Sequence, residues 1–147
     1  MDLEQIFSLC SGLAMLGWLG LALAPRLEFT RDTMPSLIIP IILGVTYAYL
    51  MFSFSGSASD DGGFGSLAEV KALFGVDALL LAGWIHYLAF DLFVGSWEVR
   101  DSQNKGIAHW LVIPCLLLTF LLGPAGLVLY LIIRTVTTRD TNLYATG

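Results

Sequence analysis

Four long apolar runs constrain this chain more than any other feature, and they cover residues 6–24, 34–54, 76–94 and 107–133. About 20 residues of α-helix, rising about 1.5 Å per residue, cross the roughly 30 Å hydrocarbon core of a bilayer. Inside lipid, every backbone polar group must be paired within the protein, and continuous apolar runs favour helices over the alternating strands of a barrel. The sequence therefore predicts an all-α integral membrane protein, a single domain over residues 1–147 built as a bundle of four transmembrane helices.

The composition supports this class and excludes others. Of the 147 residues, 56% are hydrophobic and only 13% are charged, which is too little charge to cover the surface of a soluble domain. The net charge is −5 and the basic residues are scattered, so we expect the lipid bilayer and no nucleic acid as a partner. Cys10 and Cys115 lie inside apolar runs, where inert buried thiols are expected. The acidic start lacks the basic region of a signal peptide, so the first run is expected to remain in the mature protein.

The segments between the runs have their own patterns. Residues 55–65 are rich in Gly and Ser and predict a flexible loop, and residues 135–147 predict a polar tail. Ser66 followed by Glu69 resembles a capping box, which predicts a short interfacial helix after the loop. Pro40 is expected to kink the second helix.

The basic residues give no clear orientation under a four-span topology, which places both chain ends on one side of the membrane. The two sides then carry similar numbers of Lys and Arg, so the positive-inside rule does not decide between them. The side of the chain ends holds Lys71, Arg134 and Arg139, and the other holds Arg26, Arg31, Arg100 and Lys105.

Ionisable residues in the third run point to function, because a charge inside a membrane helix is costly. Asp77 and Asp91 share one helical stripe at about 100° per residue, whereas His86 lies on a different face. If the third helix ends near residue 94, His109 enters the membrane at the depth where Asp91 leaves it, and these two side chains are expected to meet. His86 is expected to lie about a turn and a half deeper.

Three interpretations of these residues stay open. A carboxyl group and an imidazole in a low dielectric suit general acid–base catalysis. The same residues, His86, Asp91 and His109, could instead supply ligands to a divalent metal, while the staggered depths of the two histidines argue against a bis-histidine haem. In the third interpretation Asp91 pairs with an arginine and each histidine binds a backbone carbonyl, while Asp77 only caps its helix.

Several segments resemble one family of membrane proteins. Residues 84–93 read WIHYLAFDLF, residues 106–109 read GIAH, and residues 123–126 read GPAG, with Pro114-Cys115 between them and Leu129-Tyr130 after them. These segments resemble the abscisic-acid-deficient-4 family, the neoxanthin synthase-like membrane proteins, over nearly the whole chain and most strongly from the third helix onward. A His and an Asp five residues apart inside a membrane helix make the resemblance specific.

The resemblance implies a role in carotenoid metabolism. Plant members are associated with the conversion of the epoxide violaxanthin into the allene neoxanthin, an isomerisation without net redox change. We expect an intramembrane isomerase of a carotenoid or another long apolar isoprenoid, with Asp91 as base and a histidine as acid, in a bacterial inner membrane or a thylakoid-type membrane. The alternative is a carotenoid-binding or membrane-complex assembly subunit without chemistry of its own. Self-association into a homo-oligomer stays open. The predicted catalytic residues are His86, Asp91 and His109, and the predicted substrate-binding residues are Trp84, Tyr87, Phe90 and Asp77.

Overall fold

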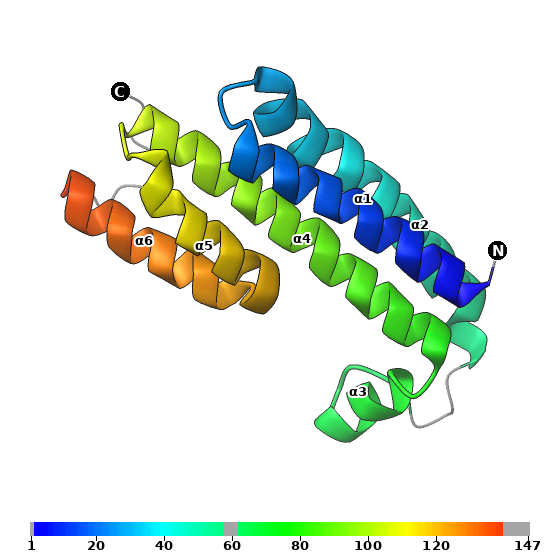
Figure 1. The fold of residues 1–147 in the computed structure, drawn as a ribbon. Coiled ribbons are helices and arrows are strands. Elements are labelled where there is room, and N and C mark those ends of the chain that lie inside the picture. Colours follow the sequence, from blue (N-terminus) through cyan, green and yellow to red (C-terminus); the bar gives the residue numbers. More distant parts are fainter. Residues whose placement is uncertain (1, 58–61, 140–147) are drawn as a thin grey trace.

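The computed structural model describes residues 2–57 and 62–139, and these residues form helices and short turns with no strand. The longest helix, α4, lies at the centre, with α1 and α2 on one side and the antiparallel pair α5 and α6 on the other (Figure 1). The elements are α1 (Leu3–Leu23), η1 (Phe29–Ile38), α2 (Ile39–Phe54), η2 (Ser55–Ser57), α3 (Leu67–Leu73), α4 (Asp77–Asn104), α5 (His109–Leu122) and α6 (Pro124–Thr138).

Three helical stretches of the described chain are long and apolar enough to cross a membrane: α1, the continuous run Phe29–Ser57 through η1 and α2, and α4. This result fits the predicted class of integral membrane protein. The first helix begins at Leu3, three residues earlier than predicted, because the Asp2 side chain accepts a hydrogen bond from the backbone N–H of Gln5.

The helix that contains α2 begins at Phe29 rather than near residue 34, and its first ten residues form a π-helix, η1. Pro35 lies inside η1 and has no N–H to give to an α-helical bond. The Ser36 hydroxyl donates to the Asp32 carbonyl and helps to satisfy this turn. The Thr30 hydroxyl, which donates to the Ala24 carbonyl at 2.5 Å, fixes the start of η1 against the end of α1.

The third predicted helix, 76–94, is ten residues too short, since α4 continues to Asn104. Residues 95–104 read as a polar loop in the sequence, yet Ser96, Glu98 and Asp101 are buried in the packed helix. Gly95 allows close approach here, because a Cβ atom at this position would lie 2.6 Å from a ring carbon of Trp18 on α1. These three side chains therefore face protein rather than solvent.

The single fourth spanning helix that we predicted, 107–133, is a helical hairpin instead. The chain reverses at Gly123, whose φ of +49° favours glycine, and Pro124 starts α6. The two arms have 14 and 15 residues, about 21 to 22 Å of helix, which is less than a hydrocarbon core of roughly 30 Å. The start of α5 and the end of α6 therefore lie at the same end of the molecule, and the hairpin packs beside the C-terminal half of α4 (Figure 1).

The hairpin changes the distribution of charge that the four-span topology implied. Arg134 of α6 pairs with Asp101 near the end of α4, so the end of α6 lies at the same end of the molecule as the loops after α1 and α4. Six of the seven Lys and Arg residues, all except Lys71, now belong to this end, which we call the basic end. The opposite end of the molecule contains Asp2, which precedes α1, and the short helix α3.

The short predicted interfacial helix is present as α3, and its Ser66 side chain accepts from the Glu69 N–H as the capping pattern predicted. Of the predicted flexible loop, residues 58–61 lie outside the described residues, and residues 55–57 form the short helix η2. The predicted tail begins later than residue 135, because α6 continues to Thr138; residues 140–147 lie outside the described part.

Candidate functional site

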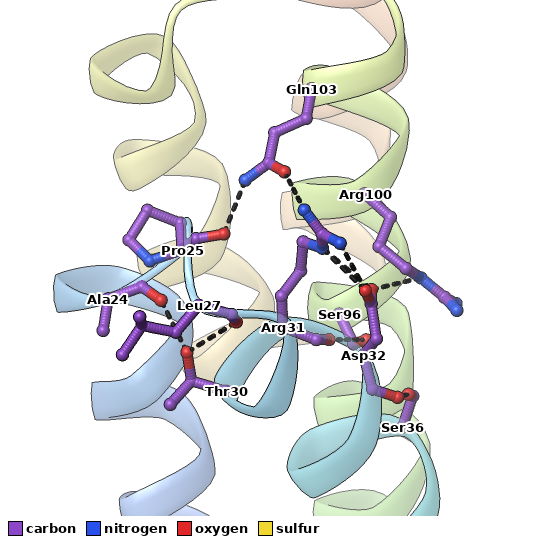
Figure 2. A network of polar contacts seen from close by, with 10 residues as sticks. All are labelled: Ala24, Pro25, Leu27, Thr30, Arg31, Asp32, Ser36, Ser96, Arg100 and Gln103. Carbon is purple, nitrogen blue, oxygen red and sulfur yellow. Dashed lines mark hydrogen bonds and ion pairs between the residues drawn. The ribbon is translucent and has the colours of Figure 1, made fainter.

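One polar cluster joins the start of η1 to α4 at the basic end. Figure 2 shows Arg31 with its guanidinium group on the Asp32 carboxylate and on the Gln103 side chain, to which it donates at 2.6 Å. Gln103 in turn donates to the Pro25 carbonyl at 2.7 Å, and the Ser96 hydroxyl donates to the Arg31 carbonyl at 2.9 Å. Every contact in this cluster satisfies a backbone or side-chain group, so its role is to fasten the α1–η1 connection to α4.

A second cluster lies deeper, between α4 and the hairpin. The Asp101 carboxylate accepts from the Tyr130 hydroxyl at 2.6 Å and from Arg134 Nε at 2.7 Å, and the two donors are fully buried. One turn further into the bundle, the Thr119 hydroxyl donates to Glu98 Oε1 at 3.0 Å. The hairpin thus covers a row of acidic side chains on α4 and supplies a partner to each of these two.

Asp91 lies at the midpoint of the 28-residue α4, where the hairpin turns. A Cβ atom on Gly123 would lie 3.0 and 3.1 Å from the two Asp91 carboxyl oxygens, which places the carboxyl group against the tip of the hairpin. One of these oxygens, Oδ2, is buried and has no hydrogen-bond partner among the described residues. Tyr87, one turn earlier on α4, interacts with Asp91, and its hydroxyl donates to the Phe120 carbonyl at 2.9 Å.

The turn between α5 and α6 sets the surroundings of the Asp91 carboxyl group. Non-helical backbone at membrane depth is tolerated where it is buried in protein or lines a cavity, and such breaks often mark binding sites. The start of α6 directs the positive end of its dipole toward the region of Asp91, and the Tyr87 hydroxyl can donate or accept a proton. Asp91 and Tyr87 therefore form a small acid–base pair halfway along α4.

The predicted catalytic residues do not come together. His86 lies on another face of α4, where its ring stacks on Phe90 with centroids 4.5 Å apart and faces Tyr47 of α2 at 5.8 Å. His109 begins α5, and its Nε2 atom lies 3.1 Å from the Ala22 carbonyl at the end of α1. The prediction that His109 meets Asp91 was wrong because α4 continues for thirteen residues beyond Asp91, about 20 Å of helix.

The same geometry bears on the metal interpretation. Within residues 2–57 and 62–139, no three His, Cys, Asp or Glu side chains converge as a metal site would require. The set His86, Asp91 and His109 does not form one site. For His109, the arrangement matches the third interpretation of the sequence, in which a histidine binds a backbone carbonyl.

The predicted substrate-binding residues divide between two faces of α4. Trp84 and Tyr87 stack on one another with ring centroids 5.4 Å apart, and Trp84 also contacts Phe7 of α1 at 5.9 Å. Both belong to the Asp91 stripe of α4. Phe90 instead packs on His86 and is 60% exposed on the outer surface.

A groove of about 690 Å³ runs between the first half of α1 and the first half of α4 and ends at this aromatic group. Its walls are mainly apolar, and its mouth carries three carboxyl groups. Asp77, the remaining predicted binding residue, is exposed at this mouth. The lining residues are Asp2, Leu3, Glu4, Phe7, Asp77, Leu80, Leu81 and Trp84.

These features define a class of protein: a helical membrane-type protein with a central acidic helix, a hairpin that covers half of it, and an apolar groove along the other half. The chain belongs to the ABA DEFICIENT 4-like family, whose model matches residues 5–130. It is similar to Protein ABA DEFICIENT 4, chloroplastic, of Arabidopsis thaliana, with 28% identity over 123 residues that cover 79% of this chain and 54% of the relative. The chain therefore spans about half the length of that curated relative. No solved structure matches the chain.

The sequence interpretation missed Glu98, Asp101 and Thr119 because it placed residues 95–105 in a loop and examined only the charges inside the apolar runs. A signal was available. Asp91, Glu98 and Asp101 are separated by seven and three residues, which places them near one face of a continuous helix. Tyr130 and Arg134 are four residues apart and share a face in the same way.

Proposed function

We propose that this chain is an intramembrane enzyme that isomerises a carotenoid or a similar long apolar isoprenoid, in a bacterial inner membrane or a thylakoid-type membrane. The observation that carries the proposal is the Asp91–Tyr87 pair, a carboxyl group with an unpartnered buried oxygen beside a hydroxyl, with the Tyr87 ring stacked on Trp84, where an apolar groove ends. Membership of the ABA DEFICIENT 4-like family supports the substrate class, because the resemblance to this family implies a role in carotenoid metabolism.

The groove supports an elongated apolar substrate. Along the groove from Asp77 to Trp84, α4 rises about 10 Å, and Tyr87 and Asp91 follow within about another 10 Å on the same stripe of the helix. The hairpin leaves this half of α4 uncovered, so a substrate dissolved in lipid reaches it without entering water. Trp84 and Phe7 are each 41% exposed and provide aromatic surface along the path.

The proposed reaction needs one base and one acid. Asp91 removes the proton from the polyene carbon attached to the epoxide ring, and the electrons of that C–H bond form a new double bond to the epoxide carbon. The C–O bond of that carbon breaks, the oxygen keeps its electron pair, and Tyr87 donates a proton to it. Asp91 then returns its proton to the Tyr87 oxygen, so the cycle closes without an oxidant, a reductant or a second substrate.

The test is the pigment profile of carotenoid-producing cells that express the chain. Asp91→Asn is expected to lower conversion by at least about 100-fold, the size of a general-base contribution, at equal amounts of folded protein. Asp32→Asn is the matched control, because it makes the same chemical change in the polar cluster that only fastens η1 to α4. Conversion is expected to persist in that variant.

The competing function is a carotenoid-binding or assembly subunit, which the well-paired cluster of Asp101, Tyr130 and Arg134 would suit, because it braces the hairpin. This function predicts that pigment co-purifies with the chain and that its chemical structure is unchanged. It also predicts that Asp91→Asn lowers the folded yield and leaves the pigment profile as it was. That pair of results would replace the enzyme proposal.

A further inference from the structure

Glu98 is the most deeply buried acidic side chain of the described residues and has no place in the proposed reaction. It is 0% exposed, and only its Oε1 atom has a partner, the Thr119 hydroxyl at 3.0 Å. Its Oε2 atom is buried without a hydrogen bond. A carboxylate with one neutral hydrogen bond in a low-dielectric interior is several kcal/mol less stable than in water, and such groups hold a proton instead.

The packing of the hairpin fixes this single contact. A Cβ atom on Gly126 of α6 would lie 2.1 Å from Thr119 Oγ1 and 2.6 Å from the Cys115 carbonyl, so the two arms touch at Thr119. The Thr119 side chain is therefore held between α6 and α4. This close packing keeps the Thr119 hydroxyl beside Glu98.

The charged and titratable groups around Glu98 come from three helices. The one cation among them, Arg134, donates from Nε to Asp101 Oδ2 at 2.7 Å, where the Tyr130 hydroxyl also donates. The positive charge on this face is therefore directed to Asp101. The groups are Asp91 and Asp101 on α4, Cys115 and Thr119 on α5, and Tyr130 and Arg134 on α6.

Asp91, two turns earlier on the same face, is less deeply buried than Glu98. It is partly exposed, it interacts with the Tyr87 hydroxyl, and it lies against the hairpin tip at the start of α6. A negative charge on a partly exposed carboxyl group loses less solvation than a charge on a fully buried one. Of the two carboxyl groups, Glu98 is therefore the one for which burial favours the neutral form more strongly.

We propose that Glu98 is protonated at neutral pH and acts as a positioning residue, so that no second negative charge lies two turns from Asp91 on this face of α4. The protonation state of Glu98 follows from its own surroundings. Its catalytic consequence rests on the proposed function, because a neutral Glu98 avoids like-charge repulsion that would otherwise keep the base protonated.

Infrared spectroscopy of the purified chain in lipid at neutral pH tests the protonation state without any substrate. The carbonyl stretch of a protonated carboxylic acid is expected in the wild type, absent in Glu98→Gln and retained in Asp91→Asn. Thr119→Ala is expected to keep the band but raise its frequency, because the carbonyl oxygen loses its hydrogen bond, and this second variant keeps the test valid if Glu98→Gln folds poorly. A wild-type spectrum without that band, or a band that Asp91→Asn removes, would overturn the proposal.

Turnover then separates this inference from the proposed function. Glu98→Gln mimics the protonated acid and is expected to keep turnover near that of the wild type, while also removing any loss of activity at high pH that ionisation of Glu98 causes. Loss of turnover in Glu98→Gln as large as that in Asp91→Asn would show that Glu98 must exchange its proton, and would overturn the inference alone. Unchanged turnover in Asp91→Asn would instead overturn the proposed function and leave the infrared result standing.

Discussion

The half of α4 after Asp91 lies under the α5–α6 hairpin, and the half before it borders the groove beside α1. In the covered half, Glu98 and Asp101 each have a partner from the hairpin. In the open half, the stripe that leads from Asp77 to Tyr87 is aromatic and apolar apart from its mouth. The difference shows that one helix borders both a braced polar interior and an apolar groove, with Asp91 between them.

The first test of this comparison is the side of the membrane that each end of the molecule faces. Its result is expected to be all-or-none. The basic end is expected to face the cytoplasm, or the equivalent compartment, because six of the seven Lys and Arg residues belong to it. A green fluorescent protein fused after the C-terminus is expected to fluoresce, and alkaline phosphatase placed in the loop after η2 is expected to be active. Two reporters on the same side of the membrane would contradict the hairpin topology, and the reverse pattern would contradict the predicted orientation.

The next largest effect is a loss of stability, expected in the half of α4 that the hairpin covers. Arg134→Met leaves Asp101 without its buried cation, and removal of one partner of a buried pair costs about 3 to 5 kcal/mol. Unfolding in mild detergent, followed by circular dichroism, measures this change. The double variant Asp101→Asn with Arg134→Met is expected to recover part of the loss, and a double variant less stable than Arg134→Met would show that the two residues do not act as a pair.

A smaller loss of stability is expected at the contact between the two arms of the hairpin, α5 and α6. Gly126→Ala places a methyl group 2.1 Å from Thr119, and an overpacked interior costs about 1 to 3 kcal/mol. Gly12→Ala on α1 is the matched control, because its added methyl group meets no atom within 4 Å and the exchange favours a helix. Thermal unfolding of the two variants is expected to differ in sign, and equal effects would mean that the arms of the hairpin do not pack as described.

The smallest effect on stability is expected at the boundary itself. Tyr87→Phe removes one hydrogen bond to the Phe120 carbonyl, which costs about 1 kcal/mol. Its effect on turnover is expected to be much larger, at least about 100-fold, because the proposed acid is lost. Tyr49→Phe, at an exposed position on α2, is expected to change neither quantity. Equal turnover in the two variants would remove Tyr87 from the mechanism.

The sequence was sufficient for the parts of the fold that depend on local rules. Apolar run length located α1 and α2, and the spacing of Ser66 and Glu69 located the start of α3. Asp91 was found because a charge within an apolar run is costly. The rest depended on tertiary structure, since the polar segment 95–104 packs against the hairpin, η1 and α1. The apolar run 107–133 is long enough to span, and only the conformation of Gly123 reverses it.

The most direct test of the account uses the purified chain in lipid vesicles that contain one carotenoid epoxide. Chromatography with mass detection then separates substrate from product. The account predicts a product of unchanged mass and altered retention with the wild type, and none with Asp91→Asn although that variant still binds the pigment. Equal conversion by the two chains, or bound pigment that the wild type leaves unconverted, would contradict it.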